Sequence, residues 1–501
     1  MKIAVVGTGY VGLVTGTCLA YLGHTVTCMD RDVERIEKLQ RGISPIYEAG
    51  LDELLQENTG AGRLQFSTSL QEALVEKDFL VLAVGTPADE AGRADLAQVE
   101  AVTESLAQLP RQKELLLVMK STVPVGTCLR QEERLAELTV PGRYRVISCP
   151  EFLREGSAVG DFLHPDRIVI GARDQGDAAR VKELFGGIET TFLLTDSPTA
   201  EMIKYASNGF LATKISFMNE IARLCEKTGA DVTGVARGMG LDTRIGEKFL
   251  NAGLGYGGSC FPKDTLALIS LAEDLGYDFR ILKAVVGINT GQRRMAVEKL
   301  AEMLGGSLEG RTVGMLGLSF KPGTDDLREA PSLDIAGQIM EQGGQVQAYD
   351  PLVKEVPPAE VRRRGRQGLV EGTGKPAERA VKTVEETGKT AEGPAAEMVR
   401  KPTGEVAETL ASNGNAAERG DHHEAAETLG QTERLTMADS PYEAAAGADA
   451  VILVTEWEEF GKLELSKLKA AMAGNVFLDG RNFLSPEQMR SRGFNYSGMG
   501  R

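Results

Sequence analysis

The beginning of the chain constrains its fold more than any other segment. Residues 2–7, KIAVVG, form a short apolar run of the kind found in buried strands, and the glycine-rich turn GTGYVG opens the helical stretch that follows. Gly7, Gly9 and Gly12 allow a tight bend and a close approach of the backbone to a ligand. The N–H groups at the start of the helix can then bind a pyrophosphate. This unit of strand, turn and helix predicts a dinucleotide-binding domain.

The next strand indicates which dinucleotide is bound. The segment HTVTCMD predicts a strand that ends at Asp30, where an acidic residue accepts hydrogen bonds from the ribose hydroxyls of adenosine. Its carboxylate would repel a 2′-phosphate, and we therefore expect NAD rather than NADP as the cofactor. Arg31 points weakly in the other direction, and we interpret it as a solvated residue or one that stacks on the adenine.

Three further apolar runs, each leading into a polar turn, continue this pattern. They are FLVLAVGTP (79–87), LLLVMKSTVP (115–124) and RVISCPEF (145–152). Strands that alternate with helices predict a doubly wound parallel sheet. Ligands bind such sheets at the carboxyl ends of the strands, so the turns after these runs are the places where we expect chemistry.

The chain of 501 residues is longer than one hydrophobic core usually organises. Residues 199–300 show long helical periodicity, and strand patterns resume at RTVGMLGLSFKP and continue through QVQAYDP, ADAVILVTEW and GNVFLDGRN. We expect an α/β fold of two Rossmann-like, doubly wound lobes joined by a long central helical region. The N-terminal, NAD-binding lobe would span 1–198, the central helical domain 199–300, and the C-terminal lobe 301–501.

The C-terminal lobe contains a segment of different composition at about 355–437. It is rich in Ala, Glu, Thr, Gly and Lys and almost lacks aromatic and large aliphatic residues. Such a segment buries too little apolar surface to offset the entropy of the chain. We interpret it as a low-complexity, disordered or loosely helical insertion, with a regulatory or partner-binding segment as the alternative.

Charge and cysteine usage exclude several classes of protein. A net charge of −16 argues against a nucleic-acid partner, because phosphate backbones require a basic face. No run of about 18 apolar residues occurs, so we expect no membrane span. The chain begins without a signal-peptide pattern, and its six cysteines form no CxxC pair. We therefore expect a reduced, cytoplasmic protein without a metal site.

One cysteine stands out by its surroundings. Cys260 lies in GYGGSCFPKD (255–264), among glycines and a proline, with Lys263 and Asp264 close behind it. A cysteine becomes nucleophilic where cationic or dipolar neighbours stabilise its thiolate. Four other cysteines fit the alternative of a small buried hydrophobic residue better: Cys18, Cys28, Cys149 and Cys225. No histidine is well placed for a catalytic base, so we expect carboxylate, lysine and thiol chemistry.

Several motifs together resemble the UDP-glucose 6-dehydrogenase family, in its bacterial form. They are GTGYVGL, GTP, KSTVPVGT, CPEFLREGSA, EMIKYASNGFLATKISFMNEIA, GYGGSCFPKD and GLSFKPGTDDLREAPS, and they occur in order over residues 1–350 and 441–490. The resemblance implies a two-step, four-electron oxidation of UDP-glucose at C6 to UDP-glucuronate, for polysaccharide biosynthesis, with two NAD per sugar. It also implies a homodimer built on the central helices and a C-terminal lobe that binds the UDP-sugar.

Two alternatives to this function remain open. The first is the same chemistry on another nucleotide sugar, a UDP-N-acetylhexosamine or GDP-mannose, because one or two changes in the binding site can redirect substrate choice. The second is a non-catalytic protein that retains a dehydrogenase scaffold. The joint presence of Cys260, Lys204, Asn208 and Asp264 speaks against the second alternative, because a binding module would not need them.

The resemblance also implies a catalytic set. Cys260 would attack the C6 aldehyde to give a thiohemiacetal, and the second oxidation would leave a thioester that water hydrolyses. Lys204 and Asn208, four residues apart, share one helix face and would stabilise the oxyanion. Glu151 and Asp264 would accept protons and activate water, and Thr122 would help to hold that water.

The ligand-binding residues follow from the same resemblance. For NAD they are the three glycines of the first turn with Asp30, Arg35, Thr86, Thr122, Glu155, Lys263 and Arg328. For the sugar nucleotide they are Phe152, Leu153, Arg154, Glu155, Lys204, Asn208, Arg244, Phe249, Leu250, Asn251, Ala252, Gly253, Gly257, Lys321 and Arg481. Lys38 competes with Arg35 for its role, and Arg481 could act within its own chain or from the second subunit. The family commonly has tyrosine at the position of Phe249, so a hydrogen bond from that hydroxyl is lost or replaced.

Overall fold

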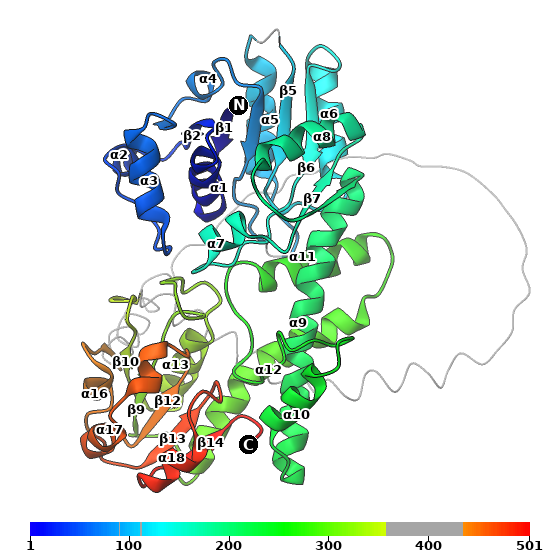
Figure 1. Cartoon of the computed structure of the whole chain (residues 1–501). Coiled ribbons are helices and arrows are strands. Elements are labelled where there is room, and N and C mark those ends of the chain that lie inside the picture. The colour runs from blue at the N-terminus through cyan, green and yellow to red at the C-terminus, as the bar shows by residue number, and fades with distance from the viewer. Residues whose placement is uncertain (90, 111–112, 357–433) are drawn as a thin grey trace, which may run out of the picture.

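The computed structural model describes residues 1–89, 91–110, 113–356 and 434–501. It shows two α/β lobes, one above the other in Figure 1, joined by a group of helices. Most of the expected insertion at 355–437 lies outside the described residues. Its last three residues, Leu435–Met437, form strand β11 at the edge of the second sheet, so regular structure resumes slightly earlier than the composition indicated.

The N-terminal lobe contains an eight-stranded sheet in the order β3-β2-β1-β4-β5-β6-β7-β8. The strands are β1 (Lys2–Val6), β2 (Thr25–Met29), β3 (Leu64–Ser67), β4 (Phe79–Leu82), β5 (Leu115–Met119), β6 (Tyr144–Ser148), β7 (Arg167–Gly171) and β8 (Thr191–Thr195). The helices are α1 (Tyr10–Tyr21), α2 (Val33–Gln40), α3 (Leu51–Gly60), α4 (Leu70–Ala73), α5 (Ala97–Gln108), α6 (Thr127–Leu138), α7 (Ala158–Leu163) and α8 (Gln175–Lys182), followed by the 3₁₀ turn η1 (Glu183–Phe185).

The direction of the strands agrees with the prediction over most of this sheet. Strands β3 to β6 run parallel, whereas β7 and β8 are parallel to each other and antiparallel to β6. The reversal was not predicted, because the pattern of an apolar run carries no information on strand direction.

The turn between β1 and α1 requires its glycines. Gly7 has a φ of +93°, which disfavours residues with a side chain. A Cβ atom on Gly12 would lie 1.9 Å from the carbonyl oxygen of Gly7. Helix α1 can therefore pack closely on the sheet, and it is buried along most of its length.

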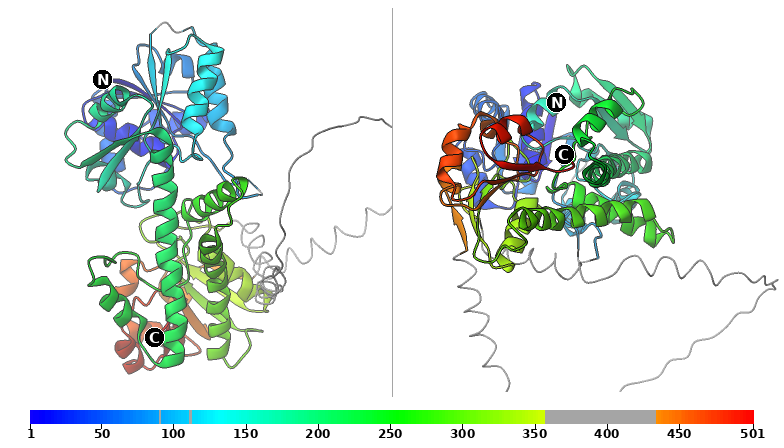
Figure 2. Two further views of the ribbon diagram at one scale, coloured as in Figure 1. Left: turned by 90° about the vertical axis from the view of Figure 1, so that its right-hand side faces the viewer. Right: turned by 90° about the horizontal axis from the view of Figure 1, so that it is seen from below.

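The central region consists of α9 (Ser197–Thr228), α10 (Val232–Gly240), α11 (Phe261–Asp274) and α12 (Arg280–Met303). Asp196 begins α9 by accepting a hydrogen bond from the amide of Thr199, and Gly229, with a φ of +76°, ends it. At 1.5 Å per residue the helix is roughly 48 Å long, and Figure 2 shows it running from one lobe along the other. Helices α11 and α12 pack against α9. Residues on these helices can therefore contact both lobes.

The C-terminal lobe has a six-stranded parallel sheet in the order β11-β10-β9-β12-β13-β14. The remaining strands are β9 (Thr312–Leu316), β10 (Gln345–Tyr349), β12 (Ala450–Leu453), β13 (Val476–Asp479) and β14 (Asn495–Gly498). The helices are α13 (Pro331–Glu341), α16 (Pro441–Ala444), α17 (Leu465–Ala471) and α18 (Pro486–Ser491), with the 3₁₀ turn η3 (Glu458–Lys462). This strand order repeats that of β1 to β6, which agrees with the prediction of two Rossmann-like lobes.

Asp350 follows β10 at the position that Asp30 occupies after β2. Its carboxylate is buried and accepts hydrogen bonds from the amides of Leu318 and Ser319, at 2.8 and 3.1 Å. The carboxylate of Asp350 is therefore already bonded to backbone amides of its own lobe.

None of the helices that the structure describes is long and apolar enough to cross a membrane.

Candidate active site

Cys260 lies at the start of α11, on a glycine-rich loop that contacts the C-terminal lobe. The amide of Gly258 donates to the carbonyl oxygen of Arg328 at 2.9 Å, and Gly258 has a φ of +82°. A Cβ atom on Gly257 would lie 2.2 Å from the carbonyl oxygen of Glu329. Only glycine allows the loop to approach the second lobe this closely. The cysteine is thus held where the two lobes meet.

Buried polar side chains on helix α12 form hydrogen bonds with the backbone of this loop. The amide group of Asn289 bonds both backbone groups of Tyr256, accepting from N–H at 2.7 Å and donating to the carbonyl at 3.0 Å. Gln292 donates to the carbonyl of Gly253 at 2.8 Å, and Arg293 donates to that of Tyr256 at 3.1 Å. Sequence reasoning missed these residues. Their signal is a set of polar residues at positions 289, 292 and 293, on the buried face of a helix.

Lys204 and Glu151 form a buried ion pair. Lys204 lies on α9, Glu151 follows β6, and Nζ lies 2.8 Å from Oε1, with side chains 4% and 6% exposed. Burial alone would raise the pKa of Glu151, but the charge and hydrogen bond of Lys204 hold it below its usual value. Burial alone would lower the pKa of Lys204, and Glu151 reverses that effect. Both groups are therefore charged at neutral pH.

Asp264 joins Asn208 and Lys263. The amide of Asn208 donates to Oδ2 of Asp264 at 2.6 Å, and Lys263 donates to Oδ1 at 2.5 Å. Asp264 is buried in the first turn of α11, one turn after Cys260. Lys204 and Asn208 lie on the same buried face of α9, as their spacing indicated. Both are bonded to carboxylates. Lys263, which we expected at NAD, is bonded to Asp264.

The Cys260 thiol lies within the field of these charges. All six cysteines lie in the described part of the chain. Five of them are buried, and Cys260 is half-buried. Burial nevertheless raises the pKa of the Cys260 thiol to about 11, and the charge of Glu151 raises it further while Lys204 lowers it. Ser259 Oγ lies 3.6 Å from Sγ. With a pKa of about 11, the Cys260 thiol carries its proton at neutral pH.

We expect the alkylation rate of Cys260 by iodoacetamide to rise about tenfold for each pH unit between roughly pH 7 and 10, because only the thiolate reacts. The fraction of thiolate grows in this way below a pKa of about 11. Mass spectrometry of the modified peptides measures the rate, and the five buried cysteines serve as internal controls. A rate that is already constant near neutral pH would contradict the prediction.

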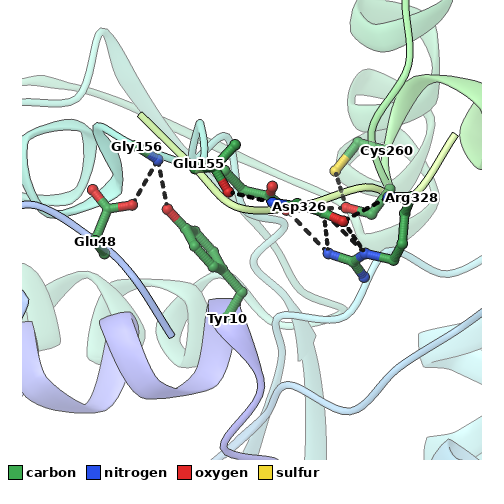
Figure 3. A network of polar contacts seen from close by, with 9 residues as sticks. Tyr10, Glu48, Glu155, Gly156, Cys260, Asp326 and Arg328 are labelled. Carbon is green, nitrogen blue, oxygen red and sulfur yellow. Dashed lines mark hydrogen bonds and ion pairs between the residues drawn. The ribbon is translucent and has the colours of Figure 1, made fainter. Parts of the chain in front are cut away.

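A network around Glu155 connects the two lobes beside Cys260 (Figure 3). Glu155 accepts from Ser259 Oγ at 3.2 Å and from Arg328 at 3.3 Å, and Arg328 donates to Asp326 at 2.6 Å. Burial and the charge of Asp326 raise the pKa of Glu155. Burial opposes ionisation of Asp326, but Arg328 holds its pKa below the usual value. Two predicted ligand residues, Glu155 and Arg328, thus meet, and Asp326 is a member that sequence reasoning missed.

Glu48 is a second missed residue near this site. Its carboxylate accepts from the amides of Gly156 and Ala158 at 2.7 and 2.8 Å, and the hydroxyl of Tyr10 lies 2.8 Å from the amide of Gly156 (Figure 3). A Cβ atom on Gly156 would lie 2.8 Å from the carbonyl oxygen of Gly323 in the other lobe. Glu48 therefore fixes the backbone next to Glu155.

The first turn fits a dinucleotide. Helix α1 begins at Gly9 without a side-chain cap, and a Cβ atom on Gly9 would meet nothing within 4 Å. The helix N-terminus is therefore open to a phosphate. Asp30 Oδ2 accepts from the amide of Thr8 at 2.7 Å, and its Oδ2 lies 3.6 Å from Arg35. Burial opposes ionisation of Asp30, but hydrogen bonds from Thr8 hold its pKa below the usual value. The acid is thus charged, as NAD selection requires.

The loops after β4 and β5 meet at the predicted water-binding residue. Thr86 Oγ1 donates to the carbonyl oxygen of Thr122 at 2.8 Å. Glu201 on α9 accepts from the amides of Gly126 and Cys128 at 2.5 and 2.8 Å, and so ties the end of this loop to the helix that carries Lys204. Thr86 and Thr122 therefore lie side by side at the carboxyl edge of the sheet.

The segment Phe249–Gly253 follows the central helices. Leu250 and Ala252 are buried in a small core with Met218, whereas Asn251 is exposed. Phe249 has a φ of +65°, and its ring centroid lies 6.2 Å from that of Phe261. The amide and the carbonyl group of Gly253 are already bonded to Asn219 and Gln292, so Phe249 and Asn251 are the residues of this segment left for a ligand.

Arg481 and Lys321 bring the C-terminal lobe to the site. Arg481 donates to the carbonyl oxygens of Val454 at 2.7 Å and Gly255 at 3.2 Å, so within one chain it already contacts the cysteine loop. Lys321 is largely buried, and burial lowers its pKa. Phe152 places its ring 5.3 Å from Nζ of Lys204.

Three predicted residues are not directed into this cluster. Arg154 pairs with Asp161, and its side chain is mostly exposed. Arg244 pairs with Asp242, and 87% of its side chain is exposed. Leu153 packs against the core of the N-terminal lobe. In a single chain, none of these side chains reaches Cys260.

Comparison with known proteins accounts for most of the chain. Residues 1–189 match the NAD binding domain of the UDP-glucose/GDP-mannose dehydrogenase family, and residues 198–291 match its central domain. The UDP binding domain of the same family matches residues 314–386 and 385–486.

Individual relatives agree with these matches. The chain is 42% identical to the UDP-glucose 6-dehydrogenase of Pseudomonas aeruginosa, over all of this chain and 98% of that protein. It is 51% identical to UDP-glucose 6-dehydrogenase YwqF of Bacillus subtilis, over 70% of this chain and 80% of that one. A solved UDP-glucose dehydrogenase from Pyrobaculum islandicum superposes with a TM-score of 0.78 at 35% identity, covering 99% of this chain and 97% of that one.

Proposed function

Because the chain belongs to the UDP-glucose/GDP-mannose dehydrogenase family, we propose that it oxidises UDP-glucose at C6 to UDP-glucuronate with two NAD. The observation that carries this function is the half-buried Cys260 beside a buried set formed by Lys204, Asn208, Asp264 and Glu151. A thiol, a cation, an amide donor and two carboxylates are the groups that an alcohol-to-acid oxidation through a covalent intermediate requires.

NAD bound at the first turn would supply the hydride acceptor for both oxidations. The first oxidation turns the C6 alcohol into an aldehyde before any bond to Cys260 exists. The thiol then adds to the aldehyde carbon: the C–S bond forms as the carbonyl π bond opens, and the thiol proton passes by way of a carboxylate to the C6 oxygen, which gives a thiohemiacetal. Loss of a second hydride leaves a thioester, which water cleaves to restore the thiol. In sum, UDP-glucose, two NAD⁺ and water give UDP-glucuronate, two NADH and three protons.

The neighbours of Cys260 supply charge and proton transfer. Lys204 and Asn208 donate to the C6 oxygen where negative charge develops. Glu151 and Asp264, which are hydrogen-bonded to these two donors, accept protons from the alcohol, the thiol or the attacking water. Thr122, on the loop joined to Thr86, positions that water. During the reaction, each carboxylate therefore gives up its hydrogen bond to Lys204 or Asn208 and contacts the reacting atoms instead.

The substrate binds between the lobes. Contacts to the sugar and the diphosphate come from the segment Phe249–Gly253, the side chains of Lys321 and Arg481, and the loop that begins at Phe152. Phe249 offers no hydroxyl to a phosphate. The same site chemistry on a UDP-N-acetylhexosamine or GDP-mannose is the alternative.

We also propose a cytoplasmic homodimer built on the central helices. Phe210, Phe217 and Leu224 are spaced seven residues apart on α9, and their exposed fractions are 65%, 50% and 58%. A stripe of large apolar side chains on one helix face is typical of a surface covered by another subunit. The molecular mass in solution, from sedimentation equilibrium, tests the dimer.

A panel of nucleotide sugars tests the function. The purified protein is incubated with NAD and, separately, UDP-glucose, UDP-N-acetylglucosamine, UDP-N-acetylmannosamine and GDP-mannose, and both NADH and the products are quantified. We expect UDP-glucose to be consumed fastest, with two NADH formed for each UDP-glucuronate. Faster turnover of another sugar would assign the substrate elsewhere, and one NADH per sugar would contradict the four-electron oxidation.

A further inference from the structure

Lys120 is a buried lysine next to the segment that carries Glu151. It follows β5 at the carboxyl edge of the N-terminal sheet and is 7% exposed. Its Nζ donates to the carbonyl oxygen of Pro150 at 3.3 Å, and lies 3.8 Å from Sγ of Cys149 and 5.7 Å from the ring centroid of Phe185. Among the described residues, no carboxylate forms an ion pair with it. A buried cation in such surroundings is costly, so a gain elsewhere is expected.

Glu151 is the acid that gains from this cation. It directly follows Pro150, and the charge of Lys120 acts on its carboxylate in the same direction as that of Lys204. The groups that face Glu151 are Lys204 from α9, Lys120 from the end of β5 and Cys260 from the start of α11. Lys204 thus bonds the Glu151 carboxylate directly, and Lys120 bonds the backbone of the preceding residue, Pro150.

The two cations have different tasks during the proposed reaction. When Lys204 donates to the C6 oxygen, it shares its charge with the substrate, and Glu151 loses part of its ion pair. A buried carboxylate without a cation takes up a proton and can no longer act as a base. Lys120 donates to the carbonyl oxygen of Pro150 and not to the reacting atoms, so its position does not depend on the substrate.

We propose that Lys120 is a positioning residue that fixes the Cys149–Pro150–Glu151 segment and keeps the Glu151 carboxylate ionised while Lys204 engages the substrate. It touches neither the sugar nor NAD and acts through Glu151. The proposal rests on the proposed function, in which Glu151 acts as a base. This role also accounts for the position of Lys120 directly before Ser121 and Thr122. Its side chain joins the Thr122 segment to the Glu151 segment, and these two segments serve the hydrolytic water.

Three substitutions separate the charge of Lys120 from its hydrogen bond. Lys120→Arg keeps both, Lys120→Gln keeps a donor without the charge, and Lys120→Met removes both. Lys77→Met is the matched control, because Lys77 is also 7% exposed but precedes β4 at the opposite edge of the sheet and bonds Thr27. The measurements are the pH dependence of kcat, KM for UDP-glucose, and the mass of the enzyme after acid quench during turnover.

We expect Lys120→Met to lower kcat at pH 7 by about 10- to 100-fold, because general-base catalysis is weakened. The acid limb of its pH profile should move upward by about one pH unit, because a cation near Glu151 is lost. The covalent thioester should accumulate, while KM for UDP-glucose changes less than about twofold if ground-state binding is unaffected. Lys120→Gln should show the same shift of the acid limb, and Lys120→Arg and Lys77→Met should keep the wild-type profile.

The outcomes distinguish positioning from general support of the fold. If Lys120→Met fails to fold, Lys120→Gln carries the same test. An unshifted acid limb in Lys120→Gln, or an equal loss in Lys77→Met, would overturn the proposal. The proposed function is judged on the wild type alone: failure to form two NADH per UDP-glucuronate would refute it, whatever the Lys120 variants show.

Discussion

Replacement of Cys260 by serine is expected to lower the rate of UDP-glucuronate formation by about a thousandfold or more, the scale at which loss of a covalent nucleophile is felt. The serine hydroxyl is a weaker nucleophile than a thiol, and among the described residues no histidine belongs to the set around Cys260 that could activate it. Its addition to the aldehyde would give a hemiacetal, and only loss of the second hydride would turn this into an oxygen ester, which is cleaved less readily than a thioester. The variant should therefore not complete the second oxidation, even where it binds UDP-glucose and NAD.

Stopped-flow absorbance at 340 nm and product analysis measure this effect. In the serine variant we expect at most one fast NADH per active site and no sustained formation of UDP-glucuronate. Cys225→Ser is the matched control, since Cys225 is buried on α9 away from the loop and should retain two NADH per product. A Cys260→Ser enzyme as active as the wild type would show that the cysteine has only a structural role.

The sequence was most informative where a local motif has one structural solution. The turn GTGYVG predicted the first βαβ unit because a side chain at Gly12 would collide with the backbone of Gly7. The spacing of Lys204 and Asn208 placed both on one buried face of α9 for the same kind of reason, since the period of a helix is fixed. Such features depend on a few neighbouring residues, so they can be predicted without knowing how distant segments pack.

The missed features depend on contacts between distant segments. Glu48 bonds the amide of Gly156, and Asn289 bonds Tyr256, but neither pairing is visible in the periodicity of its own helix or loop. The antiparallel direction of β7 likewise follows from how the chain returns to the sheet. The protonated state of Cys260 could not be predicted either, because burial and the charge of Glu151 outweigh Lys204 only once all three are placed.

The ion pair of Lys204 with Glu151 leads to the second large effect. Lys204→Met keeps the length of the side chain and removes its charge. We expect kcat to fall by about 10²- to 10³-fold, the usual result of removing one donor to a developing oxyanion. Because Glu151 remains buried, the variant should also lose about 3–5 kcal/mol of folding stability, as other broken buried ion pairs do. Lys120 reduces this loss but cannot replace a partner at 2.8 Å.

The double variant Lys204→Met/Glu151→Gln separates stability from catalysis. Neutralising Glu151 removes the unpaired charge, so urea unfolding of the double variant should show most of the lost stability restored, while kcat stays low.

The pH dependence of the folding stability gives an independent check. In the wild type the folded-state pKa of Glu151 is depressed, so its contribution to stability is present above the ordinary glutamate pKa and disappears as the pH falls through the lower folded value. That acid-labile contribution should be absent from both variants. Recovery of activity along with stability would mean that Lys204 serves only to neutralise Glu151, and that the oxyanion is stabilised by Asn208 alone.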